Sequence, residues 1–386
     1  MTRWENYLLT TKKILDQYNG SLPLHHFLKT FFKSNPQMGS RDRKQISQLV
    51  YDYFRLGHWS RETMLREDRI LIALFLCEET PNPVLEFFRP AWNAQIALSL
   101  TEKLQFLDLP SVSDIFPYAD ELSANIDPWA YSASFLRQPN LYVRARYNKL
   151  ADITQLLEKA AIPYALAGET AIALPNGTKV DAVITDKSWY EIQDLSSQET
   201  GQLFQPAPKS YWWDCCAASG GKSILLKDIE PSVELLVSDV RTSILENLQR
   251  RFKEAGVKNF HAKVLDLTDD NVDHILPRTQ FDNILLDAPC SGSGTWGRTP
   301  ENLYYFDINK IGYYQSLQKR IAANVVKCLK PGGALIYITC SVFREENEEV
   351  LEYMVTELGL QAQQAGVIKG YDRAADTMFA ARLVKV

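Results

Sequence analysis

The segment YWWDCCAASGGK, residues 211–222, joins an apolar strand pattern to a glycine loop. The strand pattern covers residues 211–215, and Gly220 and Gly221 permit a close approach between the backbone and a ligand. A helix that begins after such a loop presents free backbone amides, which can hold a carboxylate. The segment therefore predicts a strand, a ligand-binding turn and a helix in succession.

Later residues repeat this alternation of strands and helices. Strand patterns occupy residues 211–215, 234–238, 261–265, 283–286 and 334–339, and helical patterns occupy residues 243–255 and 311–329. Such alternation is typical of an α/β fold with a doubly wound, mainly parallel sheet. Ligands of these sheets bind beyond the carboxyl ends of the strands, where the strand order reverses.

Acidic residues follow two of the predicted strands. Asp239 can accept hydrogen bonds from both hydroxyls of a ribose, and Asp266 can contact an adenine amine. The alternative for both is helix capping or turn chemistry, which is common for acids at such junctions. The loop lacks the G-x-G-x-x-G pattern of dinucleotide-binding proteins, so the pattern favours S-adenosylmethionine as the ligand.

Cysteines follow two other strands, in the segments DAPC (287–290) and TCS (339–341). Carbon 5 of cytosine becomes nucleophilic only after a thiolate adds to carbon 6, and it can then attack a sulfonium methyl group. A second group near the first thiol can help to remove the carbon 5 proton before the enzyme sulfur leaves. The alternative for each cysteine is burial as a small hydrophobe. The pair indicates methyl transfer to a pyrimidine carbon.

The composition is that of a folded globular protein with room for two or three domains: 386 residues, 46% hydrophobic and 23% charged. No apolar run approaches the roughly 20 residues that cross a membrane, and no signal-peptide pattern follows Met1, so we expect a cytoplasmic protein. The six cysteines form no CxxC pair, and the sequence predicts no metal site.

The formal net charge of −5 disfavours a globally basic surface for nucleic acid, so phosphate contacts would have to be local. Two groups of basic residues are candidates for such contacts: Arg41, Arg43, Lys44 and Arg55 in one group, and Arg137, Arg144, Arg146 and Lys149 in the other. For any single residue the alternative is a solvated surface charge. Only the clustering of these basic residues in two groups favours RNA as a binding partner.

Three regions are expected from these patterns. Residues 1–125 have helical periodicity and form an all-α domain. Residues 126–205 mix short strand patterns with a helix at 148–160 and form a small α+β subdomain. Residues 206–386 form the doubly wound domain.

The chain resembles the RNA (cytosine-5) methyltransferases of the RsmB/Sun type over roughly residues 141–383. Four segments carry the resemblance: 190–198, 214–222, 287–294 continued by Arg298 and Pro300, and 339–341 trailed by Glu345, Glu346 and Asn347. The resemblance implies a Rossmann-like class I methyltransferase domain in residues 206–386. The helices around residues 42–55 are similar to the NusB-like RNA-binding domain of some members.

The resemblance also implies roles for four residues. Cys340 would attack carbon 6 and Cys290 would promote release of the methylated base. Asp287 would hydrogen-bond the cytosine, and Lys222 would lower a thiol pKa or orient a phosphate or the methionine carboxylate. The residues expected to bind S-adenosylmethionine are Cys216, Ala217, Ala218, Ser219, Gly220, Gly221, Lys222, Asp239, Asp266 and Asp287.

Two segments depart from the family pattern. Ser219 stands where proline is usual, which we expect to loosen the loop without abolishing binding. Residues 376–382, DTMFAAR, replace the usual Asp-Gly-Phe-Phe, which affects the local turn.

The expected function is S-adenosylmethionine-dependent methylation of cytosine carbon 5 in RNA, with ribosomal RNA as the favoured substrate and a monomer as the favoured state. The alternatives are a cytosine-5 methyltransferase for tRNA or DNA, and a non-catalytic RNA-binding factor of ribosome assembly. Intact Cys290 and Cys340 argue against the non-catalytic alternative, and the Thr-Cys-Ser motif argues against DNA.

Overall fold

The computed structural model describes residues 2–269, 272–276 and 280–386. The chain divides into two compact units, each built from several segments. The helical unit holds the chain up to Asp120 together with Asp127–Gln138 and Trp296–Asp307. The sheet unit holds Glu121–Ile126, Pro139–Thr295 and Ile308–Val386. The small subdomain predicted for residues 126–205 therefore belongs largely to the sheet unit.

The helical unit confirms the helical periodicity of the N-terminal region. The periodic side chains of residues 46–54, such as Ile46, Val50 and Phe54, are all but fully buried. The helices of this unit are α1 (Arg3–Gln17), α2 (Leu24–Lys33), α3 (Ser40–Arg55), α4 (Arg66–Cys77), α5 (Pro83–Phe88), α6 (Pro90–Asn93), α7 (Leu100–Phe106), α8 (Pro128–Ser134) and α14 (Pro300–Tyr304).

A later segment of the chain is built into the helical unit. Trp296 is buried, and its ring lies 4.7 Å from the ring of Phe306 and 6.4 Å from that of Phe116. The carboxyl of Glu301 accepts a hydrogen bond from the amide of Leu24, the first residue of α2. Six residues after Cys290, the chain thus enters the core of a different unit.

Within the sheet unit, a small antiparallel sheet has the strand order β2-β3-β1-β4. Its elements are β1 (Leu141–Ala145), α9 (Leu150–Lys159), β2 (Ala165–Leu166), β3 (Ala171–Leu174) and β4 (Tyr190–Ile192). Val143, Ile153, Leu157 and Ile172 are fully buried and join the helix to the sheet. This sheet confirms the mixed strand and helix patterns of the region.

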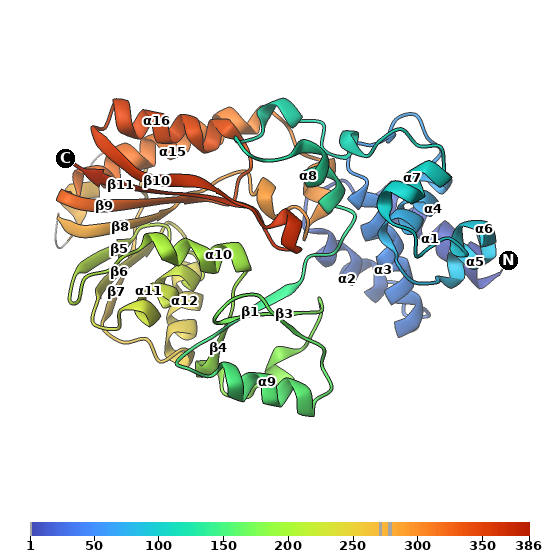
Figure 1. The fold of residues 1–386 in the computed structure, drawn as a ribbon, viewed down its shortest axis with the longest axis horizontal. Helices are drawn as coiled ribbons and strands as arrows, with labels where there is room; N and C mark the ends of the chain where they lie inside the picture. Colours follow the sequence, from blue (N-terminus) through green and yellow to red (C-terminus); the bar gives the residue numbers. More distant parts are fainter. Residues whose placement is uncertain (1, 270–271, 277–279) are drawn as a thin grey trace. The chain divides into compact units, whose positions relative to one another are not determined.

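The large sheet has seven strands in the order β10-β11-β9-β8-β5-β6-β7 (Figure 1). Strands β9, β8, β5, β6 and β7 are parallel, while β11 is antiparallel to both of its neighbours. The bounds are β5 (Tyr211–Asp214), β6 (Glu234–Asp239), β7 (Phe260–Val264), β8 (Phe281–Asp287), β9 (Leu329–Thr339), β10 (Leu360–Ile368) and β11 (Met378–Lys385). The strand order reverses at β5, between β6 and β8, as predicted for a doubly wound sheet.

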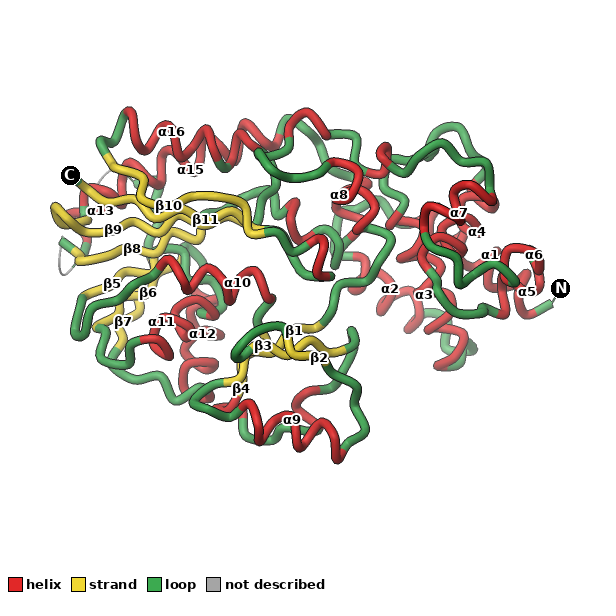
Figure 2. Tube along the Cα trace, viewed as in Figure 1, coloured by secondary structure: helices red, strands yellow, loops and turns green. Residues whose placement is uncertain are grey.

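Helices cover both faces of this sheet (Figure 2). They are α10 (Leu195–Glu199), α11 (Gly221–Ile229), α12 (Thr242–Glu254), α13 (Val272–Ile275), α15 (Lys310–Lys327) and α16 (Glu348–Thr356). Trp213 packs in the core on the side of α15, and its neighbour Trp212 packs in the core on the side of α11 and α12. Because both faces of the central strand β5 are buried, it is an apolar run rather than an alternating pattern.

Among the described residues, we find no helix with the length and apolar character that a membrane span requires.

Candidate active site

The glycine loop connects β5 to α11 through a strained turn. Ala218 has φ +44° and Gly220 has φ +83°, both in the left-handed region. A Cβ atom at Gly220 would lie 2.5 Å from the ring of Phe252 on α12, so that only glycine permits this packing. The amide of Ala217 donates to the carbonyl of Ser238 on β6. The predicted loop thus lies at the carboxyl edge of the sheet, at the point where strand order reverses.

Asp214, the last residue of β5, is a buried acid that the sequence prediction did not assign to the site. Its Oδ2 accepts a hydrogen bond of 2.6 Å from the Ser223 hydroxyl, whereas its Oδ1 has no hydrogen-bond partner among the residues that the structure describes. Burial raises the pKa of Asp214 to about 7. A buried acceptor without a partner beside a glycine loop is a place where a ligand donor can bind.

The two predicted ribose and adenine contacts are engaged in turns. Asp239 ends β6 and accepts hydrogen bonds from the amide and guanidinium of Arg241. Burial works to raise the pKa of Asp239, but the bonds from Arg241 outweigh it and hold the pKa below its usual value. Asp266 lies two residues beyond β7 and accepts from the amide and hydroxyl of Thr268. Both carboxylates therefore show the turn chemistry of the alternative interpretation, at the edge of the sheet where a ligand would bind.

The two cysteines of the sequence motifs lie in contact. Cys340 follows β9 and Cys290 follows β8, and these strands are parallel neighbours. Their Sγ atoms are 3.2 Å apart and both thiols are free. The contact with Cys340 and burial together raise the pKa of the Cys290 thiol well above its ordinary value. A sulfur that remains protonated at neutral pH therefore stands beside a second sulfur.

Lys222 and Asp287 form a second pair. The Nζ of Lys222 donates to Oδ2 of Asp287 over 2.7 Å, and the lysine side chain is 12% exposed. Burial alone would lower the pKa of Lys222, but the charge of Asp287, with smaller contributions from Cys340 and Asp214, raises it. Lys222 is thus a cation held in place by Asp287. It also interacts electrostatically with Cys340, so the ion pair and the two thiols belong to the same site.

A buried carboxyl group fixes the two cysteine-bearing turns. Glu346 has no exposed surface, and its Oε1 accepts from the hydroxyl of Ser341 over 2.7 Å. Its Oε2 accepts from the amide of Ser291 over 2.9 Å and from the side chain of Gln318 over 3.0 Å. Burial raises the pKa of Glu346. Because Ser291 follows Cys290 and Ser341 follows Cys340, this one group joins both turns.

Further hydrogen bonds hold the turn after β9. The side chain of Asn347 accepts from the Thr339 hydroxyl over 2.5 Å and donates to the Ser341 carbonyl over 2.9 Å. It also donates to the Ser123 hydroxyl over 2.8 Å. Sequence reasoning placed Glu346 and Asn347 in a motif but gave them no role, because some of their partners, Ser291, Gln318 and Ser123, are distant in the chain.

Gly294 lies between the Cys340 turn and the C-terminal segment. Its amide donates to the Cys340 carbonyl, and its carbonyl accepts from the amide of Thr377. A Cβ atom at Gly294 would lie 1.8 Å from the Thr377 carbonyl oxygen. The Thr377 hydroxyl accepts from the amides of Gly370 and Tyr371, so threonine builds a defined turn in the segment that departs from the family pattern.

Three of the predicted RNA-contacting arginines are buried and structural, which corrects the prediction for them. Arg55 donates to the carbonyls of Phe135, Arg137 and Gly297 within the helical unit. Arg144 and Arg146 both pair with Asp228 on α11, at 2.6 and 2.8 Å. These guanidinium groups are 5% exposed or less and cannot meet a phosphate in this structure. Arg41 and Lys44 remain exposed.

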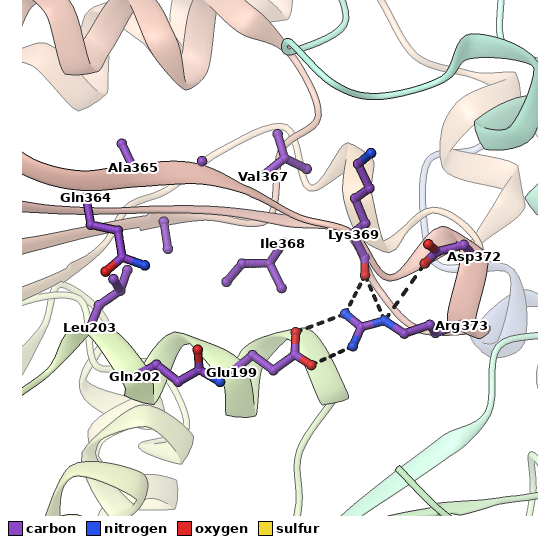
Figure 3. Close-up of a pocket in the computed structure, with 12 residues that line it drawn as sticks. Glu199, Gln202, Leu203, Gln364, Ala365, Val367, Ile368, Lys369, Asp372 and Arg373 are labelled. Carbon is purple, nitrogen blue, oxygen red and sulfur yellow. Dashed lines mark hydrogen bonds and ion pairs between the residues drawn. The ribbon is translucent and has the colours of Figure 1, made fainter. Parts of the chain in front are cut away.

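Two cavities of the described part of the sheet unit are not lined by cysteines. One of about 480 Å³ lies between β10 and the α10 region, lined by residues such as Leu203, Val367 and Ile368 (Figure 3). An ion pair between Glu199 and Arg373 closes one side of it (Figure 3). A second of about 360 Å³ lies between β4 and α12. Neither is lined by a predicted catalytic residue.

Comparison with known proteins supports the resemblance to the RsmB/Sun-type family. Residues 201–370 match the family model of 16S rRNA methyltransferase RsmB/F. The ribosomal RNA small subunit methyltransferase B of Shewanella oneidensis is 37% identical over 158 residues, which cover 41% of this chain and 36% of that protein. The protein of the same name from Xylella fastidiosa (strain 9a5c) is 30% identical over 269 residues, covering 64% and 61%. The chain thus spans about a third to three fifths of the curated relatives it matches.

Solved structures share the fold. The crystal structure of the protein PH0851 matches with a TM-score of 0.71 at 19% identity, covering 94% of this chain and 95% of that one. NSun6 from Pyrococcus horikoshii, crystallised with SFG, matches with a TM-score of 0.60 at 17% identity, covering 70% and 97%. At these identities the likeness establishes the fold alone, a Rossmann-like sheet with a helical N-terminal region.

Proposed function

We propose that this protein methylates carbon 5 of a cytosine in RNA, with ribosomal RNA as the substrate, starting from the match of residues 201–370 to the family model of 16S rRNA methyltransferase RsmB/F. The observation that carries the proposal is the contact of the two strand-end thiols, Cys290 and Cys340, at 3.2 Å. The names of the similar curated proteins support ribosomal RNA as the substrate class.

The reaction assigns one sulfur to attack and the other to release. The Cys340 thiolate forms a bond to carbon 6, and the electron pair of the 5,6 double bond makes carbon 5 nucleophilic. After methylation, the proton on carbon 5 is removed and the carbon 6–sulfur bond breaks, which restores the double bond and the thiolate. At rest, the raised pKa keeps Cys290 protonated; once that proton has passed to solvent, the Cys290 thiolate would take up the carbon 5 proton, from a sulfur that lies 3.2 Å from that of Cys340.

The residues around the glycine loop fit S-adenosylmethionine as the methyl donor. Among the described residues, the Oδ1 of Asp214 has no partner, and Asp214 and Asp239 end the neighbouring strands β5 and β6 at the edge where ligands of such sheets bind. When bound, S-adenosylmethionine supplies an electrophilic methyl group. Similarity to the fold of NSun6, which was crystallised with SFG, an analogue of this cofactor, supports the same assignment. Residues 216–222, Asp239, Asp266 and Asp287 remain the proposed contacts.

The ion pair of Lys222 and Asp287 is proposed to hold the cytosine. The Asp287 carboxylate would accept a hydrogen bond from the exocyclic amine, and Lys222, which donates to its Oδ2, would hold that carboxylate in place. The target base must leave its stack to reach the thiols, because neither sulfur can reach carbon 6 inside a helix.

Trapping the covalent adduct tests the division of labour. Cys290→Ala, Cys340→Ala and a control, Cys77→Ala at the end of α4, are incubated with S-adenosylmethionine and ribosomal RNA and run on a denaturing gel. We expect a nuclease-sensitive slow band in Cys290→Ala alone, because attack proceeds and release stalls. Cys340→Ala abolishes transfer, and Cys77→Ala resembles the wild type.

Other outcomes contradict the proposal in different ways. A band in Cys340→Ala alone reverses the two roles. Methyl transfer that survives in Cys340→Ala removes the covalent mechanism. Methyl transfer to DNA but not to RNA contradicts RNA as the substrate.

A further inference from the structure

Ser219 lies in the part of the glycine loop that most needs outside support. It is exposed, and it stands between Ala218 and Gly220, which both have positive φ. A non-glycine residue such as Ala218 in this region costs on the order of 1 kcal/mol or more and persists only when its surroundings hold it. Serine itself restricts φ little, in contrast to proline.

Arg251 on α12 supplies two hydrogen bonds to this serine. Its Nη1 donates to Oγ of Ser219 over 2.8 Å and to the Ser219 carbonyl over 3.2 Å. The tight packing of Gly220 against Leu248 and Phe252 keeps α12 beside the loop. The arginine therefore holds both the side chain and the backbone of the residue at the tip of the strained turn.

Glu191 on β4 orients the arginine. Its Oε2 accepts from Nε of Arg251 over 2.9 Å and from Nη2 over 2.5 Å. The Glu191 side chain is 6% exposed and that of Arg251 is 26% exposed, so the pair is partly shielded from water. A charge-assisted pair of this kind, with two bonds to one oxygen, fixes the guanidinium plane.

We infer that Arg251 is a positioning residue that holds the glycine loop in its ligand-binding conformation through Ser219, with Glu191 holding the arginine. The inference rests on the proposed function in that S-adenosylmethionine is the ligand of the loop. It assigns a role to the small sheet, because β4 supplies the carboxylate on which the arginine depends. It also explains how the loop tolerates serine at residue 219.

Binding of S-adenosylmethionine without RNA, measured by isothermal titration calorimetry, tests the inference. We expect Arg251→Gln to raise the dissociation constant about tenfold, the effect of a lost charge-assisted hydrogen bond. Arg250→Gln is the matched control, because Arg250 precedes Arg251 on α12 and its guanidinium bonds Asn247 on the same helix. The control should bind as the wild type does. Melting temperatures without ligand identify variants that fail to fold.

A double variant distinguishes positioning through Ser219 from a general structural role. Ser219→Pro fixes φ by its ring, so Arg251→Gln should matter less in that background. An equal loss of affinity in both backgrounds means that Arg251 does not act through Ser219 and overturns the inference. Arg251→Lys, which keeps the charge and loses the planar fork, should fall between wild type and Arg251→Gln.

The outcomes separate the inference from the proposed function. Wild-type protein that does not bind S-adenosylmethionine overturns both. Wild-type protein that binds it, with Arg251→Gln within twofold of Arg250→Gln, overturns the inference and leaves the proposed function standing.

Discussion

Two buried carboxyl groups at the same edge of the sheet differ in how they are paired. Among the described residues, Asp214 at the end of β5 accepts a hydrogen bond from the Ser223 hydroxyl and has one oxygen without a partner. Glu346, after β9, accepts from three donors and uses both oxygens. Burial raises the pKa of both groups.

The difference distinguishes the glycine loop beside Asp214, where a ligand can still bind, from the two thiol turns, whose hydrogen bonds to Glu346 are already formed. A buried acceptor without a hydrogen-bond donor lowers the stability of the protein, so such an oxygen is often found where a ligand binds. At β5 that oxygen borders the glycine loop, where a ligand donor would satisfy it. After β9, both carboxyl oxygens of Glu346 accept hydrogen bonds, and these bonds hold the turns that carry the two thiols before any substrate binds.

The largest effect is expected from removing the charge at Asp214. Its pKa is about 7 in the folded protein and 3.8 in the reference state, so the folded protein binds more protons between these values. Stability therefore falls as pH rises from about 4 to about 7, by about 1.4 kcal/mol per unit. Asp214→Asn removes this dependence. Urea unfolding at several pH values should show that the free energy of unfolding of the variant, relative to that of the wild type, rises up to about pH 7 and is constant above it.

A constant difference between Asp214→Asn and the wild type across that pH range would show that Asp214 titrates normally. The buried acid would then not be strained, and the comparison with Glu346 would lose its basis.

The second effect is a loss of stability at Glu346. Glu346→Gln replaces one acceptor oxygen by an amide donor, which then faces a hydroxyl or a backbone N–H instead of accepting from it. We expect the free energy of unfolding at pH 7 to fall by about 3 kcal/mol. Glu345→Gln, at the neighbouring position, is the control and should change it little. A Glu346→Gln variant as stable as the control would mean that the turns at Cys290 and Cys340 do not depend on Glu346 for their stability.

Sequence patterns predicted the parallel core of the sheet because its strands are buried on both faces. Strands of that kind appear as short apolar runs, such as residues 211–215 and 283–286. Strand β10, in contrast, contains exposed glutamine and alanine and has no apolar run, and it was not predicted. The antiparallel edge of β10 and β11 therefore became visible only from the structure.

The prediction was weakest for charged residues, because their partners lie far away in the chain. Arg144 and Arg146 look like a basic surface patch in sequence, yet Asp228, more than 80 residues later, neutralises both in the interior. The entry of residues 296–307 into the helical unit was missed for the same reason. Local patterns located the cysteines, but not the carboxyl group that joins their turns.

A smaller loss is expected from filling the space at Gly294. Gly294→Ala would bring a methyl group into contact with the Thr377 carbonyl and force the C-terminal turn away from the Cys340 turn. We expect a loss of about 2 kcal/mol in the free energy of unfolding, the usual cost of such crowding. Gly312→Ala on α15, where a Cβ atom meets nothing within 4 Å, is the control and should not destabilise the protein. Equal stability of the two variants would exclude tight packing at Gly294.

The smallest effect on folding is expected at Ser219, and it separates the two ends of the site most clearly. Ser219 is exposed and its hydroxyl accepts a hydrogen bond from Arg251 on α12, so Ser219→Ala should change the free energy of unfolding by less than about 0.5 kcal/mol. The same substitution should raise the dissociation constant for S-adenosylmethionine about threefold, since one of the two bonds from Arg251 remains at the carbonyl. Urea unfolding and calorimetry on the same samples measure both. A variant that loses stability and affinity in proportion would mean that the loop, like the thiol turns, is part of the folded core, whereas affinity lost alone identifies the loop as the adjustable part of this site.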